Sequence, residues 1–326
     1  MFATVKDTSK HYALFWHRGV LPLLIALLAS GFVGVGTGIA GSSPSPHPAI
    51  VSRQQAASAP AMEFYEGGPY IGWTSTNTAH NLNVMTYNTD TNAFGSTQIL
   101  TETTLAGSGP ALVNWNGTLY IAWRGTDNQL NVGQYDDAHP THLANKVTLS
   151  EHSLNAPSIA AWNNRLYLGW RGTDGRLNII TSTNGRQFSS KLTYPIAIRT
   201  SPTITYTPFG LVVVWEDMST SSHIVVASYS TSISTLLKNK VTLTATSQLP
   251  VGLTAFSSPR SWIGIAWRTA SDAHIHLGVF EGSPVLQFAV ETAQTTPYGP
   301  GLTLFDYMAW TGTDTAHSVN VTLASL

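Results

Sequence analysis

Three arginines of this sequence stand at equivalent places in a repeated motif. Arg124, Arg171 and Arg268 each follow directly after a tryptophan, and Glu216 takes the same place in another copy of the motif. A guanidinium group presents a planar fork of N–H donors that suits a carboxylate. Copies arranged around a ring could therefore build an anion-binding or sugar-binding site from these four side chains. The alternative is that each arginine pairs with an aspartate of its own turn: Asp127, Asp174 or Asp272.

Glu216 and Asp217 form an adjacent acidic pair and are the candidate catalytic residues. Hydrolysis of a glycosidic bond uses two carboxyl groups that face each other across the scissile bond. The pair also interrupts the Trp-Arg-Gly-Thr-Asp pattern of other copies, and such a departure is where a function can be added to a repeat. Sequence drift in a copy that has also lost its glycine is the alternative.

His274 and His276 alternate along one segment after Asp272. On a strand this spacing places two imidazoles on one face, as a metal site requires. The sequence does not identify a third ligand, so we assign no metal site and no cofactor from it.

The elements that position these residues belong to a repeat. Six segments that end in tryptophan recur with 43 to 52 positions between successive tryptophans, and they span residues 70–73, 120–123, 167–170, 212–215, 264–267 and 307–310. This spacing fits four short strands per copy. The sequence therefore predicts an all-β fold, a six-bladed β-propeller of four-stranded antiparallel blades.

Each copy also contains turn signals and an alternating strand pattern. Asn116-Gly117 and Asn163-Asn164 follow apolar runs and indicate tight hairpins. Alternation sends Leu119, Ile121 and Trp123 to one side of their strand and the residues between them to the other. Small residues recur directly before the tryptophan, which predicts close packing of neighbouring blades against bulky side chains. We expect the tryptophans to pack in the core, with sugar stacking as the alternative.

The two ends of the repeat region complement each other. The last copy stops after its third predicted strand, and an unassigned apolar run at residues 49–53 precedes the first copy. An N-terminal strand can complete the last blade and close the ring, which removes an exposed sheet edge. Residues 49–53 could otherwise be part of the linker.

Residues 182–188 read Ser-Thr-Asn-Gly-Arg-Gln-Phe and resemble the aspartate box of the sialidase-like β-propeller superfamily. The repeat also looks like that of bacterial exported proteins with a Trp-x-Gly-Thr-Asp motif. In that superfamily the box is a structural turn between the third and fourth strands of a blade, so the resemblance implies the fold. Sialidase chemistry would need three arginines, a tyrosine nucleophile with a glutamate partner, and an acidic proton donor. The family's first arginine lies in an Arg-Ile-Pro tripeptide that is absent here, which counts against catalysis.

The N-terminal region has the layout of an export signal. Lys6, Lys10 and Arg18 precede a charge-free apolar run from residue 19 to about residue 40. Residues 1–40 are predicted to be a signal peptide or, if uncleaved, a membrane anchor, because the run is long enough to span a bilayer. Residues 41–48 are a linker rich in proline, serine and glycine, and residues 49–326 form the propeller. We therefore expect an extracellular location, secreted or on the outer face of the cytoplasmic membrane.

Composition restricts the partners. Charged residues make up 10% of the chain and the formal net charge is −1, so no basic stripe is available for nucleic acid. We expect a monomeric propeller that binds glycans or another surface polymer without catalysis. A sialidase-like glycoside hydrolase with an arginine-lined central pocket is the alternative.

Overall fold

The computed structural model of the chain describes residues 49–139, 141–207, 210–229, 237–255, 263–269, 271–303 and 307–324. The chain divides into Met1–Ser42 and Ser43–Leu326, and the described residues belong to the second unit. The predicted signal or anchor segment and the predicted linker therefore lie outside the described residues. Within the described part of the chain, no helix has the length and apolarity needed to span a membrane.

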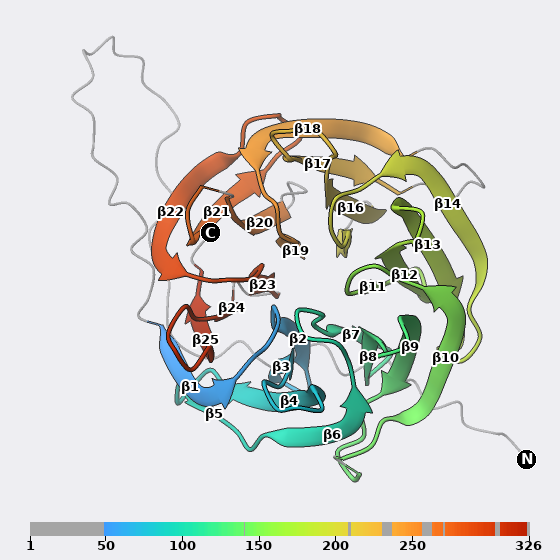
Figure 1. The fold of residues 1–326 in the computed structure, drawn as a ribbon, viewed down its shortest axis with the longest axis vertical. Helices are drawn as coiled ribbons and strands as arrows, with labels where there is room; N and C mark the ends of the chain where they lie inside the picture. Colours follow the sequence, from blue (N-terminus) through green and yellow to red (C-terminus); the bar gives the residue numbers. More distant parts are fainter. Residues whose placement is uncertain are drawn as a thin grey trace, which may run out of the picture. The chain divides into compact units, whose positions relative to one another are not determined.

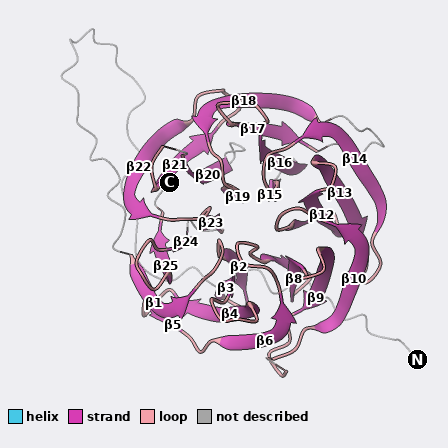
Figure 2. Cartoon of the chain, in the orientation of Figure 1, coloured by secondary structure: helices cyan, strands magenta, loops and turns pink. Residues whose placement is uncertain are grey.

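The strands of the described residues form six antiparallel sheets around a ring (Figures 1 and 2). We number these blades 1 to 6 in chain order and give their strands from the axis outward. Blade 1 contains β2 (Ala61–Tyr65), β3 (Gly68–Thr74), β4 (Asn81–Asn88) and β6 (Gln98–Thr103), with the short β5 (Ala93–Phe94) at the end of β4. Blade 2 contains β7 (Ala111–Trp115), β8 (Thr118–Arg124), β9 (Gln129–Gln134) and β10 (Ala144–His152).

The next three blades repeat this order. Blade 3 contains β11 (Ser158–Trp162), β12 (Arg165–Arg171), β13 (Arg176–Ser182) and β14 (Ser189–Ala197). Blade 4 contains β15 (Thr203–Thr207), β16 (Gly210–Glu216), β17 (His223–Ser228) and β18 (Lys238–Thr246). Blade 5 contains β19 (Gly252–Ala255), β20 (Ile263–Arg268), β21 (His274–Phe280) and β22 (Gln287–Thr295). The six-bladed propeller predicted from the sequence is confirmed.

Blade 6 closes the ring with a strand from the other end of the sequence. It contains β23 (Gly301–Leu302), β24 (Tyr307–Thr311), β25 (Ser318–Leu323) and, outermost, β1 (Ile50–Gln55). In the antiparallel β1–β25 pair, Ile50 lies opposite Val321 and Val51 opposite Asn320. The predicted closure by an N-terminal strand is therefore confirmed, and the interpretation of residues 49–53 as linker is wrong.

The hairpin turns follow the sequence signals. Asn116 and Gly117 have φ values of 52° and 74°, and Asn163 and Asn164 have 48° and 54°. Two consecutive positive φ values define the type I′ turn, whose twist matches that of the flanking strands. Asparagine and glycine tolerate this conformation better than other residues, which explains their use here.

The six repeated tryptophans are core residues. Each lies on the second strand of its blade and is at most 5% exposed: Trp73, Trp123, Trp170, Trp215, Trp267 and Trp310. Side chains of β8 alternate between two interfaces, since Ile121 packs toward blade 1 and Ala122 toward blade 3. The expected core role is confirmed, and a sugar could not stack on these buried rings in this structure.

Blades contact each other through a small residue on one sheet and a bulky residue on the next. A Cβ atom on Gly72 would lie 2.7 Å from Leu112 Cδ1 of blade 2, and one on Gly169 would clash with Ile204 of blade 4. Near the axis the backbones themselves approach, because a Cβ atom on Gly301 would lie 2.5 Å from the Pro60 carbonyl oxygen. The predicted bulky-against-small packing between blades is confirmed.

Replacement of Gly301 by alanine tests the contact where the last blade meets the first. We expect Gly301→Ala to lower the free energy of unfolding by about 2 kcal/mol, because the new methyl group meets backbone that cannot rotate away. Urea denaturation measures the effect. Gly68→Ala is the control, since its Cβ would meet nothing nearer than 3.4 Å. Equal stability of the two variants would contradict this description of the closure.

Candidate functional site

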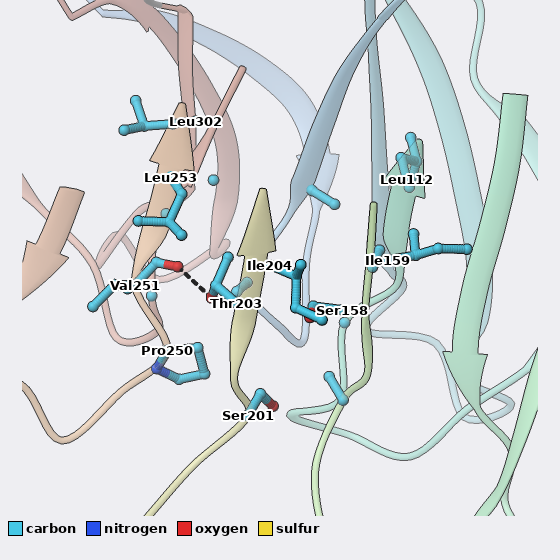
Figure 3. Close-up of a pocket in the computed structure, with 18 of the residues that line it drawn as sticks. Leu112, Ser158, Ile159, Ser201, Thr203, Ile204, Pro250, Val251, Leu253 and Leu302 are labelled. Carbon is cyan, nitrogen blue, oxygen red and sulfur yellow. Dashed lines mark hydrogen bonds between the residues drawn. The ribbon is translucent and has the colours of Figure 1, made fainter. Parts of the chain in front are cut away.

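The inner strands of all six blades surround a cavity of about 550 Å³ on the propeller axis (Figure 3). A proline lies one or two residues before each inner strand: Pro60, Pro110, Pro157, Pro202, Pro250 and Pro300. An innermost strand has one edge without a neighbouring strand, and proline is tolerated there because it has no N–H to leave unpaired. The six prolines, 45 to 50 positions apart, form one rim of the cavity and are a repeat that the sequence analysis missed.

Side-chain hydrogen bonds between inner strands hold the cavity at a fixed width. Thr203 Oγ1 donates to the Val251 carbonyl oxygen at 2.8 Å (Figure 3), and Thr254 Oγ1 donates to the Thr303 carbonyl oxygen at 2.9 Å. Between blades 1 and 2, Asn114 Nδ2 donates to the Phe64 carbonyl oxygen at 3.2 Å. These bonds join successive blades at the axis, so the cavity is preformed.

Polar and aromatic side chains are accessible at both ends of the cavity. Asn155, Gln248 and Tyr298 lie in the loops that lead into the inner strands. At the other ends of the strands, Asn114 is partly exposed and Tyr206 is 48% exposed. Small and apolar residues line most of the space between them (Figure 3). An apolar pocket with a few placed polar groups is the usual form of a small-molecule site.

Glu63 is the single ionisable acid among the described residues that line the cavity, and arginine, lysine and histidine are absent from that lining. Burial raises the pKa of Glu63 to about 8, although backbone N–H groups of Asn114 and Phe64 hydrogen-bond the carboxyl and oppose the increase. The cavity therefore carries little charge near neutral pH. It offers no cation to the carboxylate of an acidic sugar.

The three arginines singled out in the sequence are bonded within or next to their own blades. Arg124 Nη1 donates to the Leu154 carbonyl oxygen at 3.0 Å, and its Nη2 contacts Asn128 Oδ1. Arg171 Nη1 donates to Asn155 Oδ1 at 3.4 Å, and Arg268 Nε donates to the Asp272 carbonyl oxygen at 3.1 Å. None of the three lines the cavity. Among the described residues, no hydrogen bond or ion pair links these arginines to one another, so their joint role in a ligand site stays a prediction.

The alternative in which each arginine pairs with the aspartate of its turn does not hold for Arg124 and Arg171, and Arg268 contacts its turn aspartate through the Asp272 backbone carbonyl and not through the carboxylate. Asp127, Asp174 and Asp272 instead accept backbone N–H groups two residues later in the same turn, from Gln129, Arg176 and His274 at 2.9 to 3.0 Å. In the described part of the chain no ion pair joins any of these arginines to its turn aspartate. The aspartates are used to close the hairpins, and the arginines bind neighbouring amide and carbonyl groups.

Glu216 and Asp217 do not present two carboxyl groups to one open site. Glu216 is fully buried, and the Thr200 hydroxyl donates to its Oε2 while Oε1 has no partner. Burial raises the pKa of Glu216 to about 8. Asp217 Oδ1 accepts the backbone N–H groups of Ser219 and His223 at 3.1 and 3.0 Å, so it stabilises a turn. Their candidate catalytic role gains no support from this geometry.

The turn at residues 182–188 lies between the third and fourth strands of blade 3, as the aspartate-box resemblance implies. Asn184 Oδ1 accepts the N–H groups of Arg186 and Gln187 at 2.9 and 2.8 Å, and Ser182 Oγ accepts the N–H of Gly185 at 2.9 Å. The side chains thus take the place of a regular backbone turn. Membership of the sialidase-like superfamily stays a prediction.

Solved structures with the same architecture include sugar-binding proteins. An α-L-arabinofuranosidase of Fusarium graminearum in complex with arabinobiose aligns with a TM-score of 0.62 at 11% identity, over 84% of this chain and 97% of that one. The fucose-recognising lectin of Aleuria aurantia aligns with a TM-score of 0.56 at 10% identity, over 85% and 98%. A protein of unknown function from Dyadobacter fermentans aligns with a TM-score of 0.62 at 11% identity, over 86% and 98%.

No protein-family model matches the chain, and no curated protein sequence is significantly similar to it. Identities near 10% show a common fold alone. The class of protein defined so far is a six-bladed propeller with a preformed, nearly uncharged axial cavity. It shares its architecture with a glycoside hydrolase and with a lectin.

The buried carboxyl of Glu216 predicts a specific pH dependence of stability. Its pKa is about 8 in the folded protein against 4.5 as the ordinary value. The folded state favours the protonated carboxyl, so the contribution of this group to stability is fully present below pH 4.5. It is lost as the pH rises through 8, because the unfolded chain releases the proton first. Glu216→Gln, which cannot ionise, should therefore lose less stability than the wild type between pH 5 and pH 9, by on the order of 3 kcal/mol.

Urea denaturation at the two pH values measures this difference. Glu281→Gln, at an exposed position, is the control and should follow the wild type. The description of Glu216 would be contradicted if its variant lost as much stability as the wild type does. The pKa of Glu63 is also raised to about 8, so both proteins should still lose some stability as the pH rises.

Proposed function

We propose that this protein is a carbohydrate-binding propeller that takes a neutral sugar into its axial cavity without catalysis. The observation that carries the proposal is the lining of the cavity, which among the described residues holds one carboxyl group, no cation, and the exposed ring of Tyr206. Sugars are uncharged rings with apolar faces and many hydroxyl groups. Aromatic rings and neutral amide or hydroxyl groups are the side chains that suit both features.

The charge of the cavity favours neutral sugars over acidic ones. A sialic acid or uronic acid would bring a carboxylate into a space where no arginine or lysine of the described lining could pair with it, and burial of an unpaired charge is costly. The absence of a second carboxyl group in the described lining also favours binding over hydrolysis, since glycosidases of both stereochemical classes use a pair. Structural neighbours that bind arabinobiose and fucose support a sugar as the ligand class.

Two of the arginines have a positioning role in this proposal. Arg124 binds the Leu154 carbonyl from blade 2, and Arg171 binds the Asn155 side chain from blade 3. These two hydrogen bonds hold in place the loop in which Asn155 lies at the rim of the cavity. Arg268 and Glu216 contact their own turn and the Thr200 loop instead. In this proposal Arg124 and Arg171 position the rim of the cavity without touching the sugar.

We also propose that the protein is exported and is either secreted or anchored on the outer face of the cytoplasmic membrane. The support is the basic stretch followed by the long apolar run within residues 1–40. A propeller outside the cell would meet glycans or other surface polymers. A single ring needs no second copy to complete its sheets, so we propose a monomer.

Replacement of Tyr206 tests the site. Glycan-array screening of the full chain identifies a ligand, and titration calorimetry then compares Tyr206→Ala with Phe288→Ala. We expect Tyr206→Ala to weaken binding about tenfold, because the loss of a stacked aromatic contact costs about 1 kcal/mol or more. Phe288 is also exposed, at 67%, but lies on the outer strand β22, so its variant should bind normally.

Two results would contradict the proposal. One is strict dependence of binding on a sialic acid or uronic acid carboxylate, measured with matched glycans before and after its enzymatic removal or reduction. The other is release of shortened sugars from the ligand during incubation, detected by chromatography, which would identify the protein as a glycoside hydrolase.

A further inference from the structure

Blade 5 differs from the other blades at a pair of facing positions. In blades 2 and 3, Thr148 and Thr193 donate hydrogen bonds of 2.6 Å to Asn131 and Asn178, which lie opposite the repeated tryptophans. The equivalent residue of blade 5 lies opposite Trp267 and is His276, and it faces Glu291 of the neighbouring strand. A neutral pair has thus been replaced by an imidazole and a carboxylate, both of which bind metals.

The turn aspartate of the repeat supplies a third donor. Asp272 Oδ1 lies 3.4 Å from His276 Nε2, and the ligand atoms of Asp272, His276 and Glu291 all lie within 4.8 Å of one another. Aspartate occurs at this turn in other blades as well, where it closes the hairpin. In blade 5 the Oδ1 of Asp272 accepts the His274 backbone N–H at 2.9 Å, and its Oδ2 accepts the Thr269 hydroxyl at 2.8 Å. A carboxylate oxygen has two lone pairs, so Oδ1 can close the hairpin and bind a cation as well.

His274 is the fourth donor and has a nitrogen without a hydrogen bond. Its Nδ1 lies 3.4 Å from Glu291 Oε1 and 3.9 Å from Asp272 Oδ1, and it is buried without a hydrogen-bond partner. His274 and His276 are two residues apart on β21, so both rings project from the same face of the sheet. A buried ring nitrogen aimed between two carboxylates is what a cation would satisfy.

The surroundings of the cluster also suit a cation. In blades 2, 3 and 4 the ammonium groups of Lys146, Lys191 and Lys240 lie over the repeated tryptophan, 5.3 to 6.0 Å from the ring centroid. Blade 5 has Ala289 at this position. There the His276 ring stacks on Trp267 instead, with centroids 5.4 Å apart and planes 23° apart. The competing ammonium is absent, and the stacked tryptophan orients one imidazole.

We propose that Asp272, His274, His276 and Glu291 bind a divalent transition metal of the zinc type. Two imidazole nitrogens and two carboxylate oxygens form a common zinc ligand set. Bonds of about 2.0 to 2.1 Å in a tetrahedral site separate neighbouring ligand atoms by about 3.3 Å. The His274–Glu291 and His276–Asp272 separations of 3.4 Å are already near this value, whereas the 3.9 Å between His274 Nδ1 and Asp272 Oδ1 would shorten when the metal binds.

The metal would join the β20–β21 turn to the two outer strands of blade 5. Its ligands are partly exposed, from 16% for the His276 side chain to 56% for Glu291, so a metal ion can reach them from solvent. None of them lines the axial cavity. The site is therefore structural and independent of the proposed sugar binding.

The repeat itself supplies variants that should fold. His276→Asn and Glu291→Thr each restore a residue that blades 2 and 3 carry at the same position. The untagged full chain, stripped with a chelator, is titrated with Zn²⁺ by calorimetry, and its thermal unfolding is followed with and without Zn²⁺. His139→Asn is the control, because the exposed His139 side chain pairs with Asp136 at 2.9 Å and lies in blade 2, outside the proposed ligand set.

We expect the wild type and the His139→Asn variant to bind one zinc ion tightly and to unfold at a higher temperature in its presence. Both repeat-restoring variants should bind that ion at least tenfold more weakly and show little zinc-dependent stabilisation, while their metal-free unfolding temperatures stay near that of the wild type. The proposal is overturned if the wild type shows no zinc-dependent stabilisation, or if the two restoring variants bind zinc as tightly as the wild type does.

Discussion

The contact between one blade and the next is the constraint on which this structure depends. A single blade cannot bury both of its faces. The second strand of each blade, which contains the repeated tryptophan, is covered by the inner strand of the following blade. A small residue beside the tryptophan leaves room for a leucine or isoleucine of that inner strand, as Gly72 does for Leu112. Because the same contact recurs around the ring, each blade is held at a similar angle to the last. The pairing of β1 with β25 then joins the first and last segments of the propeller.

The cavity is a consequence of that packing. Inner strands that meet backbone to backbone, as at Gly301 and Pro60, cannot move closer to the axis, and threonine and asparagine side chains bond across the same junctions. The contacts between blades therefore determine the width of the axial cavity. The residues that line it are then free to vary without loss of the fold, which is how one propeller architecture can serve both a hydrolase and a lectin.

The architecture could be predicted from the sequence because its signals are local and repeated. The spacing of the tryptophans predicted the number of blades. The Asn116-Gly117 sequence predicted a hairpin turn, and the incomplete last copy predicted closure by an N-terminal strand. All three predictions agree with the structure. The site could be predicted less well. Pseudo-symmetry correctly places Arg124, Arg171 and Arg268 at equivalent positions, but the partner of each guanidinium depends on the loop beside it, and these loops differ in sequence between blades.

Other features of the site depend on contacts that a sequence does not display. The proline that precedes each inner strand was visible as a repeat, yet its position near the axis follows only from the order of strands in the sheets. Glu63 has no motif around it, and its raised pKa comes from burial. His274 and His276 were visible as a pair, whereas Glu291 joins them only through the register of β21 with β22.

A crystal structure of the full chain with a neutral oligosaccharide bound would test the central claim most directly. The account predicts the sugar inside the axial cavity, with a ring face against Tyr206 and hydroxyl groups within hydrogen-bond distance of lining residues such as Asn155 or Asn114. A sugar bound between blades or on the outer strands, with the axial cavity filled by solvent alone, would contradict it.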